Sequence, residues 1–152
     1  MKKILLAAVG LLTFPAFADC RFVIANLTNF NFTVQMGFYN GAESTIVVPP
    51  TATFNKKIKG PLQCISSSII GTGVSYISFP NDPNGGGVNY SPSTGNINFM
   101  GEYSGSSSSA YIRADNGQKV LMDGNSNGVD DKTFTIRLNF IGRPNSKSAG
   151  TI

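Results

Sequence analysis

The feature that most constrains the fold is a two-residue alternation of apolar and polar side chains. In segment 30–38 the apolar positions are Phe30, Phe32, Val34, Met36 and Phe38. In segment 133–141 they are Phe134, Ile136, Leu138 and Phe140. Successive side chains of a β-strand point to opposite faces, so this pattern predicts antiparallel strands with one buried face.

Shorter segments with the same character lie between these two. Candidate strands cover 21–25, 45–48, 53–58, 62–70, 74–79, 96–103, 110–114 and 119–122. Asn-Gly pairs at 40–41 and 116–117 suit the positive φ of tight hairpin turns. Pro49-Pro50 is expected to end a strand, because proline has no N–H to donate to a neighbour.

Nine or ten short strands with turn signals between them predict an all-β domain. After the first eighteen residues no apolar repeat with the 3.6-residue period of a helix persists. We expect an antiparallel, immunoglobulin-like β-sandwich, with a small β-barrel as the alternative. The low-complexity segments 81–96 and 104–109 are expected to be exposed, mobile loops.

The N-terminus has the pattern of a signal peptide. Lys2 and Lys3 precede an apolar run, and the small residues of Ala16-Phe17-Ala18 suit cleavage before Asp19. We therefore expect residues 1–18 to be removed and residues 19–152 to form a single exported domain, periplasmic or secreted to the cell surface. No later stretch approaches the roughly 20 apolar residues that span a membrane.

The two cysteines, Cys20 and Cys64, are expected to form one disulfide in an exported chain. The bridge would close a loop of about 45 residues and contribute roughly 4 kcal/mol in the chain-entropy model. An acylated lipoprotein cysteine at Cys20 is disfavoured, because Asp19 precedes it and Cys64 would lose its partner.

Charge argues against nucleic acid as a partner. Without Lys2 and Lys3, ten Lys and Arg remain against eight Asp and Glu, a net charge near +2. These cations form no cluster that could neutralise a run of phosphates. Charged residues make up only 13% of the chain.

Residues 123–131, DGNSNGVDD, begin like a calcium-binding loop. Ligands are expected from Asp123, Asn125, Asn127, the Val129 carbonyl and Asp131. The twelfth position holds Phe134, which cannot supply the bidentate carboxylate of such loops. A polar β-turn is the alternative reading, because Asn, Asp and Gly tolerate left-handed backbone conformations.

Catalysis is not expected. The chain contains no histidine, which removes the commonest general base and the usual activated nucleophiles. A glycan-acting hydrolase would need two facing carboxylates, for which Glu102 and Asp82 are the one candidate pair.

Four tyrosines lie in or beside Gly- and Ser-rich segments: Tyr76, Tyr90, Tyr103 and Tyr111. If their rings are exposed, they could stack on sugars or contact a protein, and core packing is the alternative.

Segment 133–151 continues from the alternating strand into Gly142-Arg143, Pro144 and Ala149-Gly150-Thr151. This order resembles the closing region of secreted pilin subunits of the spore-coat-U, chaperone–usher type. The signal peptide and a cysteine almost at the mature N-terminus are also similar to that family. The resemblance implies an incomplete immunoglobulin-like sandwich that a neighbour's strand completes.

Two functions follow as hypotheses. The first is a non-catalytic structural subunit for surface assembly or adhesion, which binds exported proteins and associates with itself or others by strand addition. The second is a stand-alone extracellular module that binds carbohydrate, such as cell-surface glycans, or protein, with Ca²⁺ as a possible stabilising ion.

Overall fold

The computed structural model of the chain describes residues 20–38, 41–58, 74–91, 96–102, 108–124 and 133–141. Within these ranges the chain forms ten strands and no helix. The strands are β1 (Cys20–Asn26), β2 (Phe32–Phe38), β3 (Glu43–Val48), β4 (Thr53–Ile58), β5 (Val74–Ser78), β6 (Gly87–Ser91), β7 (Asn96–Met100), β8 (Ser109–Arg113), β9 (Lys119–Gly124) and β10 (Thr133–Phe140).

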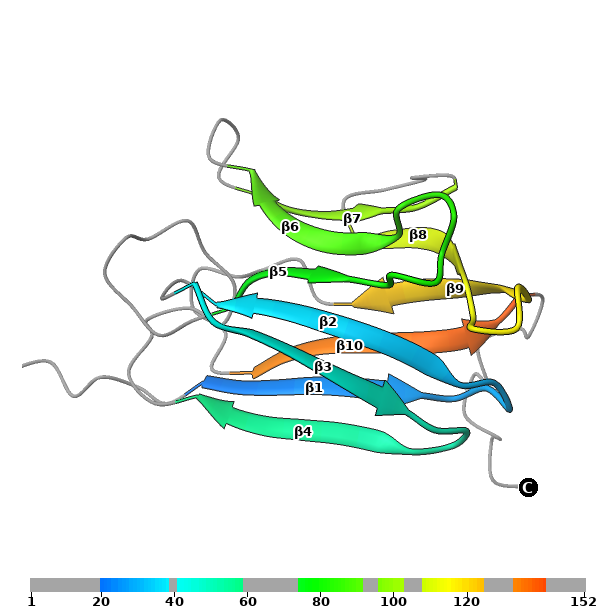
Figure 1. Cartoon of the computed structure of the whole chain (residues 1–152), viewed down its shortest axis with the longest axis horizontal. Coiled ribbons are helices and arrows are strands. Elements are labelled where there is room, and N and C mark those ends of the chain that lie inside the picture. The colour runs from blue at the N-terminus through cyan, green and yellow to red at the C-terminus, as the bar shows by residue number, and fades with distance from the viewer. Residues whose placement is uncertain are drawn as a thin grey trace, which may run out of the picture.

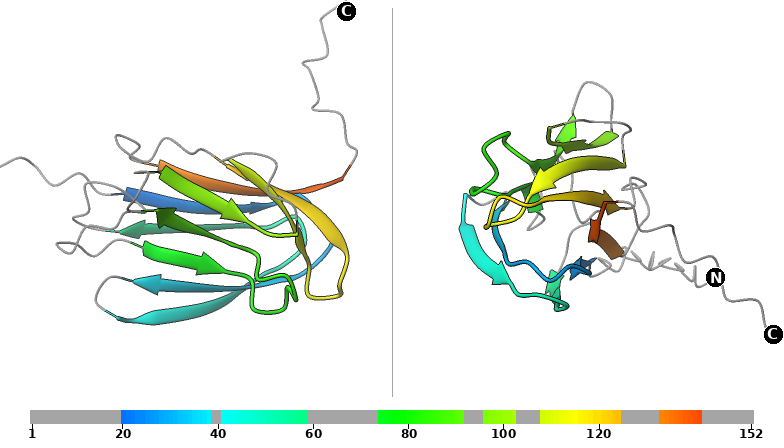
Figure 2. Two further views of the ribbon diagram at one scale, coloured as in Figure 1. Left: turned by 90° about the horizontal axis from the view of Figure 1, so that it is seen from above. Right: turned by 90° about the vertical axis from the view of Figure 1, so that its right-hand side faces the viewer.

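The strands form two five-stranded sheets that lie face to face (Figures 1 and 2). Sheet A has the order β4-β1-β10-β9-β8, and sheet B has the order β3-β2-β5-β6-β7. Figure 1 looks onto sheet B, with sheet A behind it. The predicted all-β sandwich is therefore confirmed, and the described strands do not close into a barrel.

One apolar core fills the space between the sheets. The strongest predictions hold here, because Phe32, Val34 and Met36 of β2 are fully buried. The alternating residues of β10 are buried in the same way up to Leu138, whereas Phe140 is only half-buried. The Phe134 ring stacks on Phe22 at 5.9 Å between centroids, which joins β10 to β1 inside the core.

One strand pairing departs from the antiparallel expectation. β10 lies between β9 and β1. It pairs antiparallel with β9 and parallel with β1, and the parallel register runs from Arg21↔Thr133 to Asn26↔Leu138. Parallel neighbours need a long crossover, and here the whole intervening chain supplies it. The first and last described strands therefore pair in the middle of sheet A.

The expected loop at 81–96 is wrong over its central part. Residues 87–91 form β6, which pairs with β5 and β7, and Val88 is fully buried. The glycines allow this packing, because a Cβ at Gly87 would stand 2.3 Å from the carbonyl oxygen of Ile77. The buried carboxylate of Asp82 fixes the turn before β6 by accepting hydrogen bonds from the N–H groups of Asn84 and Gly86.

Both predicted Asn-Gly hairpins place glycine at positive φ, with 79° at Gly41 and 84° at Gly117. In each, the glycine N–H bonds to the carbonyl three residues earlier, Phe38 or Ala114. In the second hairpin, this bond closes a three-residue loop that ends in a left-handed glycine. Asn116 keeps a negative φ, so glycine alone supplies the unusual conformation.

Several predictions lie outside the described residues. These are the signal peptide at 1–18, the candidate strand at 62–70, Cys64 and its bridge to Cys20, most of segment 104–109, and the closing segment from 142 onward.

The Asn26 side chain forms hydrogen bonds to two connections between the sheets, β1–β2 and β3–β4. Asn26 is 1% exposed at the end of β1, where the chain crosses to β2. Its amide nitrogen donates to the carbonyls of Phe30, Val48 and Pro49 at 2.7, 3.2 and 2.8 Å. Its oxygen accepts from the N–H and hydroxyl of Thr28 at 3.0 and 2.7 Å. The β1–β2 and β3–β4 connections are thereby joined.

Backbone hydrogen bonds reinforce the same corner. The Thr51 N–H donates to the Thr28 carbonyl, and the Asn26 N–H donates to Ala52. Thr51 adopts a φ of 57°, a strained value for a β-branched residue. The tight turn after Pro49-Pro50 therefore carries backbone strain that the hydrogen bonds to the β1–β2 connection must offset.

We predict that Asn26→Ala lowers the free energy of unfolding by about 3 kcal/mol, because buried carbonyls of two connections lose their donor together. Chemical denaturation of residues 19–152 measures this as a lower midpoint with an unchanged slope. Asn55→Ala, at an exposed position of β4, is the matched control and should cost less than about 0.5 kcal/mol. Equal effects of the two substitutions would contradict the role of Asn26.

Candidate binding face on sheet B

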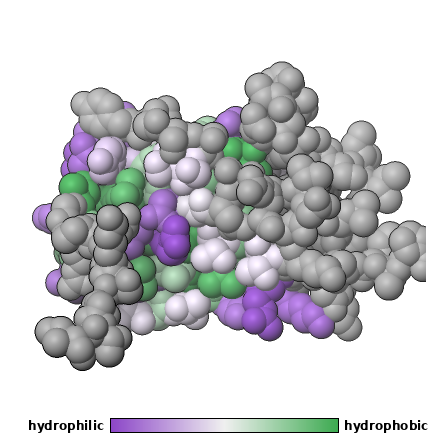
Figure 3. Space-filling model, turned by 180° about the vertical axis from the view of Figure 1, so that it is seen from behind, coloured by the Kyte–Doolittle hydropathy of each residue, from purple (hydrophilic) through white to green (hydrophobic). Residues whose placement is uncertain are grey.

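The described charges are divided unequally between the two sheets. All six described cations lie on strands of sheet A, at Arg21, Lys56, Lys57, Arg113, Lys119 and Arg137. The five strands of sheet B contain no Lys or Arg, and Glu43 is their only acidic residue. Figure 3, seen from the side of sheet A, shows strongly hydrophilic side chains at several separate places. The outer face of sheet B is therefore the nearly uncharged face of the sandwich.

The pairing registers align one residue from each strand of sheet B in a single cross-strand row. The pairs are Glu43 with Gly37, Gly37 with Tyr76, Tyr76 with Asn89, and Asn89 with Asn98. Their neighbours in sequence, such as Met36, Ile77 and Phe99, are buried, so the row lies on the outer face. We call these five residues the Tyr76 row.

Tyr76 lies over the glycine of this row. A Cβ at Gly37 would stand 2.1 Å from the Tyr76 ring, so the ring occupies the space that a side chain would fill. A bulge sets this register, since Ser75 is the extra residue of β5 and its hydroxyl donates to the Gly37 carbonyl at 3.0 Å. One face of the aromatic ring therefore packs on the sheet.

Glu43 fixes the polar end of the Tyr76 ring. The Tyr76 hydroxyl donates to one Glu43 oxygen at 2.7 Å, and the Gln35 amide donates to the other at 2.9 Å. This hydrogen bond, with smaller contributions from desolvation and from the negative charge of Glu43, raises the pKa of Tyr76 above its ordinary value of 10.0. Tyr76 therefore stays a neutral hydrogen-bonding group throughout the physiological pH range.

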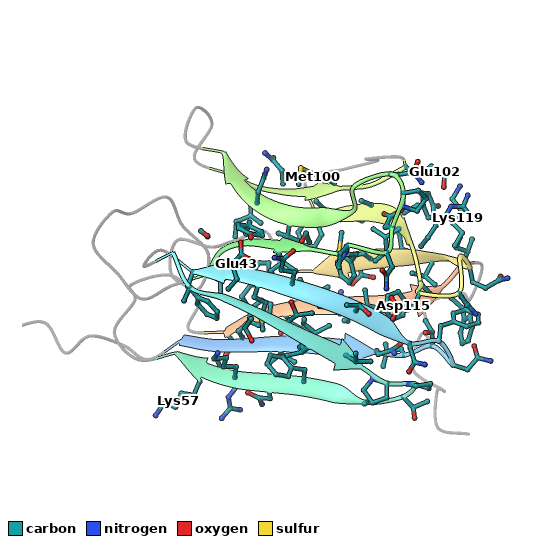
Figure 4. The ribbon with its side chains drawn as sticks, in the orientation of Figure 1. Glu43, Lys57, Met100, Glu102, Asp115 and Lys119 are labelled. Atoms are coloured by element: carbon teal, nitrogen blue, oxygen red, sulfur yellow. The ribbon has the colours of Figure 1, made fainter. Side chains whose placement is uncertain are left out.

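A second row of uncharged residues runs beside the first. It consists of Thr45, Gln35, Ser78, Gly87 and Met100, again one from each strand. The Asn89 amide approaches the Met100 sulfur at 3.4 Å, which links the two rows near β7. Glu43 and Met100 mark opposite edges of sheet B in Figure 4. Glu43 is thus the only charge among ten positions.

Asp115 closes one end of this face. Its carboxylate, from the β8–β9 turn, accepts from the Thr33 N–H and hydroxyl, both at 2.8 Å. The Asn81 amide donates to the same carboxylate at 3.1 Å. The β2 segment before Gln35 extends beyond β5, and Asp115 supplies the hydrogen-bond acceptor that the Thr33 N–H lacks there. Asp115 therefore has a structural role.

The predicted calcium ligands are only partly described. Asp123 lies on β9, where its two oxygens accept from Arg137 at 2.6 Å and from Asn139 at 2.9 Å. Asn125, Asn127, Val129 and Asp131 lie outside the described residues. In the part of the chain that is described, no three acidic or cysteine side chains gather as a metal site. Calcium binding stays a prediction.

The two carboxylates considered for hydrolysis have separate partners. Glu102 pairs with Arg113 at 3.2 Å and with Lys119 at 3.1 Å. Asp82 is buried and bound to its own turn, as described above. These contacts give each carboxylate a role in stabilising its own part of the fold.

The predicted tyrosines do not form one group. Tyr111 lies on sheet A with the Lys119 ammonium 5.2 Å from its ring centroid. The side chain of Tyr90 and all of Tyr103 lie outside the described residues. Of the described tyrosine side chains, that of Tyr76 alone lies within a set of polar side chains. The sequence signal for it was a tyrosine beside a Gly-rich segment. The alignment of Glu43, Asn89 and Asn98 with it had no signal in the sequence.

No protein-family model, curated protein or solved structure matches the chain. The described residues also contain no helix that is long and apolar enough to span a membrane.

We predict that Glu43→Gln lowers the pKa of Tyr76 towards 10, because a neutral amide replaces the carboxylate. Since the folded-state pKa is raised, the hydrogen bond stabilises the fold below pH ~10 and is lost as the pH rises through that folded pKa. NMR titration of ¹³C-labelled tyrosine measures the shift. Glu102→Gln, which neutralises a carboxylate beside sheet A, should leave Tyr76 unchanged; an equal shift in both variants would refute the assignment.

Proposed function

We propose that the protein is an exported, non-catalytic binding module that adheres to cell-surface material through the outer face of sheet B. The observation that carries this proposal is the charge division, with six cations on sheet A and one carboxylate on the strands of sheet B. Protein surfaces normally mix both signs of charge, and binding surfaces are depleted of Lys and Glu at their centres. Tyrosine and methionine, both on this face, are enriched there.

The sandwich itself supports a module that folds alone. Twenty buried apolar residues form one core, and every buried side-chain nitrogen and oxygen within the described ranges has a hydrogen-bond partner. β10 fills the position between β1 and β9, so these strands leave no gap in the middle of sheet A. The signal-peptide pattern supports export, and the lack of histidine supports a function without catalysis.

We predict that the fluorescently labelled exported chain binds intact cells, tested on bacterial and animal cells, and that Tyr76→Ala weakens this binding about tenfold, or ~1.4 kcal/mol. Tyr111→Ala, which removes a tyrosine from sheet A, is the matched control and should bind like the native chain. Flow cytometry measures the difference. Loss of binding in the control alone would place the function on sheet A.

A second candidate function is assembly by strand addition at β3. This edge strand contains no Lys, and its Val47 is 60% exposed, whereas edge strand β4 carries Lys56 and Lys57. Lysines on an edge strand oppose pairing with another chain, and β3 lacks this protection. A strand from another exported protein, or from a second copy, would continue sheet B there.

If β3 mediates assembly, the native chain forms oligomers and Val47→Lys shifts them to monomer, because a charge on the edge strand opposes pairing. Asn55→Lys on β4 is the control and should change nothing. Analytical ultracentrifugation over a hundredfold range of concentration measures the state. A chain that is monomeric throughout would exclude self-assembly at this edge and leave the stand-alone module.

A further inference from the structure

We propose that the Tyr76 row binds one extended, neutral glycan that runs across the five strands of sheet B. This inference rests on the proposed function and names the ligand class and the residues that contact it. The row offers a carboxylate at Glu43, an aromatic ring at Tyr76, and amides at Asn89 and Asn98. Carboxylates and amides bond to sugar hydroxyls, which both donate and accept.

Charge selects a neutral ligand. An anionic glycan would meet Glu43 and find no cation on any strand of sheet B. The six described cations all lie on strands of sheet A. The hydroxyl groups of a neutral glycan can form hydrogen bonds with the amides, hydroxyls and single carboxylate of this face without bringing a second charge near Glu43.

Size favours a glycan over a folded protein. Neighbouring strands are about 4.8 Å apart, so the four steps from β3 to β7 span about 19 Å. Together with the second row, the Tyr76 row covers roughly 300 Å², well below the roughly 800 Å² that each partner buries in a stable protein complex. A single narrow chain of sugar rings fits these two rows.

The glycine in the row gives the ring its position. Because Gly37 has no side chain, the Tyr76 ring can lie against the sheet instead of standing out from it. The opposite ring face is then available for stacking on the apolar face of a pyranose. The bond from Glu43 holds the hydroxyl end of the ring, so little freedom is lost when a ligand binds.

Calorimetric titration of the exported chain with cello-oligosaccharides of two to six rings tests the inference. We expect the affinity to rise with chain length and to level off at about four or five rings, as the span of the row requires. Tyr76→Ala should weaken hexamer binding about tenfold, or ~1.4 kcal/mol, and Tyr76→Phe should retain most of it. Hexagalacturonate, the anionic control, should bind at least about tenfold more weakly than cellohexaose.

Asn98→Ala separates a binding role from a structural one. Asn98 lies at the β7 end of the row, two strands from Tyr76, so its loss should weaken the hexamer but leave the disaccharide unaffected. A general structural defect would weaken both ligands equally. Thermal unfolding of each variant checks that the fold is intact, and Tyr111→Ala should bind like the native chain.

Three outcomes would overturn the inference: no binding of any neutral oligosaccharide, affinity independent of chain length, or unchanged binding by Tyr76→Ala. Cell binding then tells the two proposals apart. If it depends on Tyr76 but survives periodate oxidation of surface sugars, the binding face stands and the glycan is excluded. If the chain binds neither cells nor oligosaccharides, both proposals fail.

Discussion

The buried amide of Asn26 is the interaction on which the arrangement of the two sheets depends. Its five hydrogen bonds join the β1–β2 and β3–β4 connections, which carry the chain from sheet A to sheet B and back. Burying a polar group costs free energy unless its hydrogen bonds are all formed. The Asn26 amide therefore favours the one arrangement of the two connections in which all five bonds are present. Fixing both connections also fixes the neighbouring strands β2 and β3, from which Gly37 and Glu43 enter the Tyr76 row.

The two outer faces of the sandwich differ in chemistry although they share one core. On sheet A, cations and carboxylates pair across strands, as Arg137 does with Asp123. Exposed pairs of this kind contribute little stability, typically below about 1 kcal/mol, but they keep the face charged. On the outer face of sheet B the polar groups of the two rows are amides, hydroxyls, the Glu43 carboxylate and the Tyr76 hydroxyl that Glu43 holds. A charge-poor face of this composition is suited to contact, and its narrow dimensions suit a thin polymer.

The sequence was most informative where alternation was strongest. β2 and β10 were predicted with their buried faces, because a half-buried strand must alternate. β6 was missed, because its glycines resemble a loop while serving close packing against β5. The Tyr76 row was beyond prediction, since it requires registers between distant strands and the bulge at Ser75 shifts one of them. Asn26 showed only an Asn-x-Thr pattern, which does not reveal that two connections meet there.

The central claim is that ligand binding takes place on the outer face of sheet B. Backbone NMR spectra of ¹⁵N-labelled residues 19–152, recorded while cellohexaose is added, test it most directly. The account predicts that amide shifts cluster at the Tyr76 row and the row beside it, on all five strands of sheet B. Shifts confined to the strands of sheet A, or spectra that do not change, would contradict it.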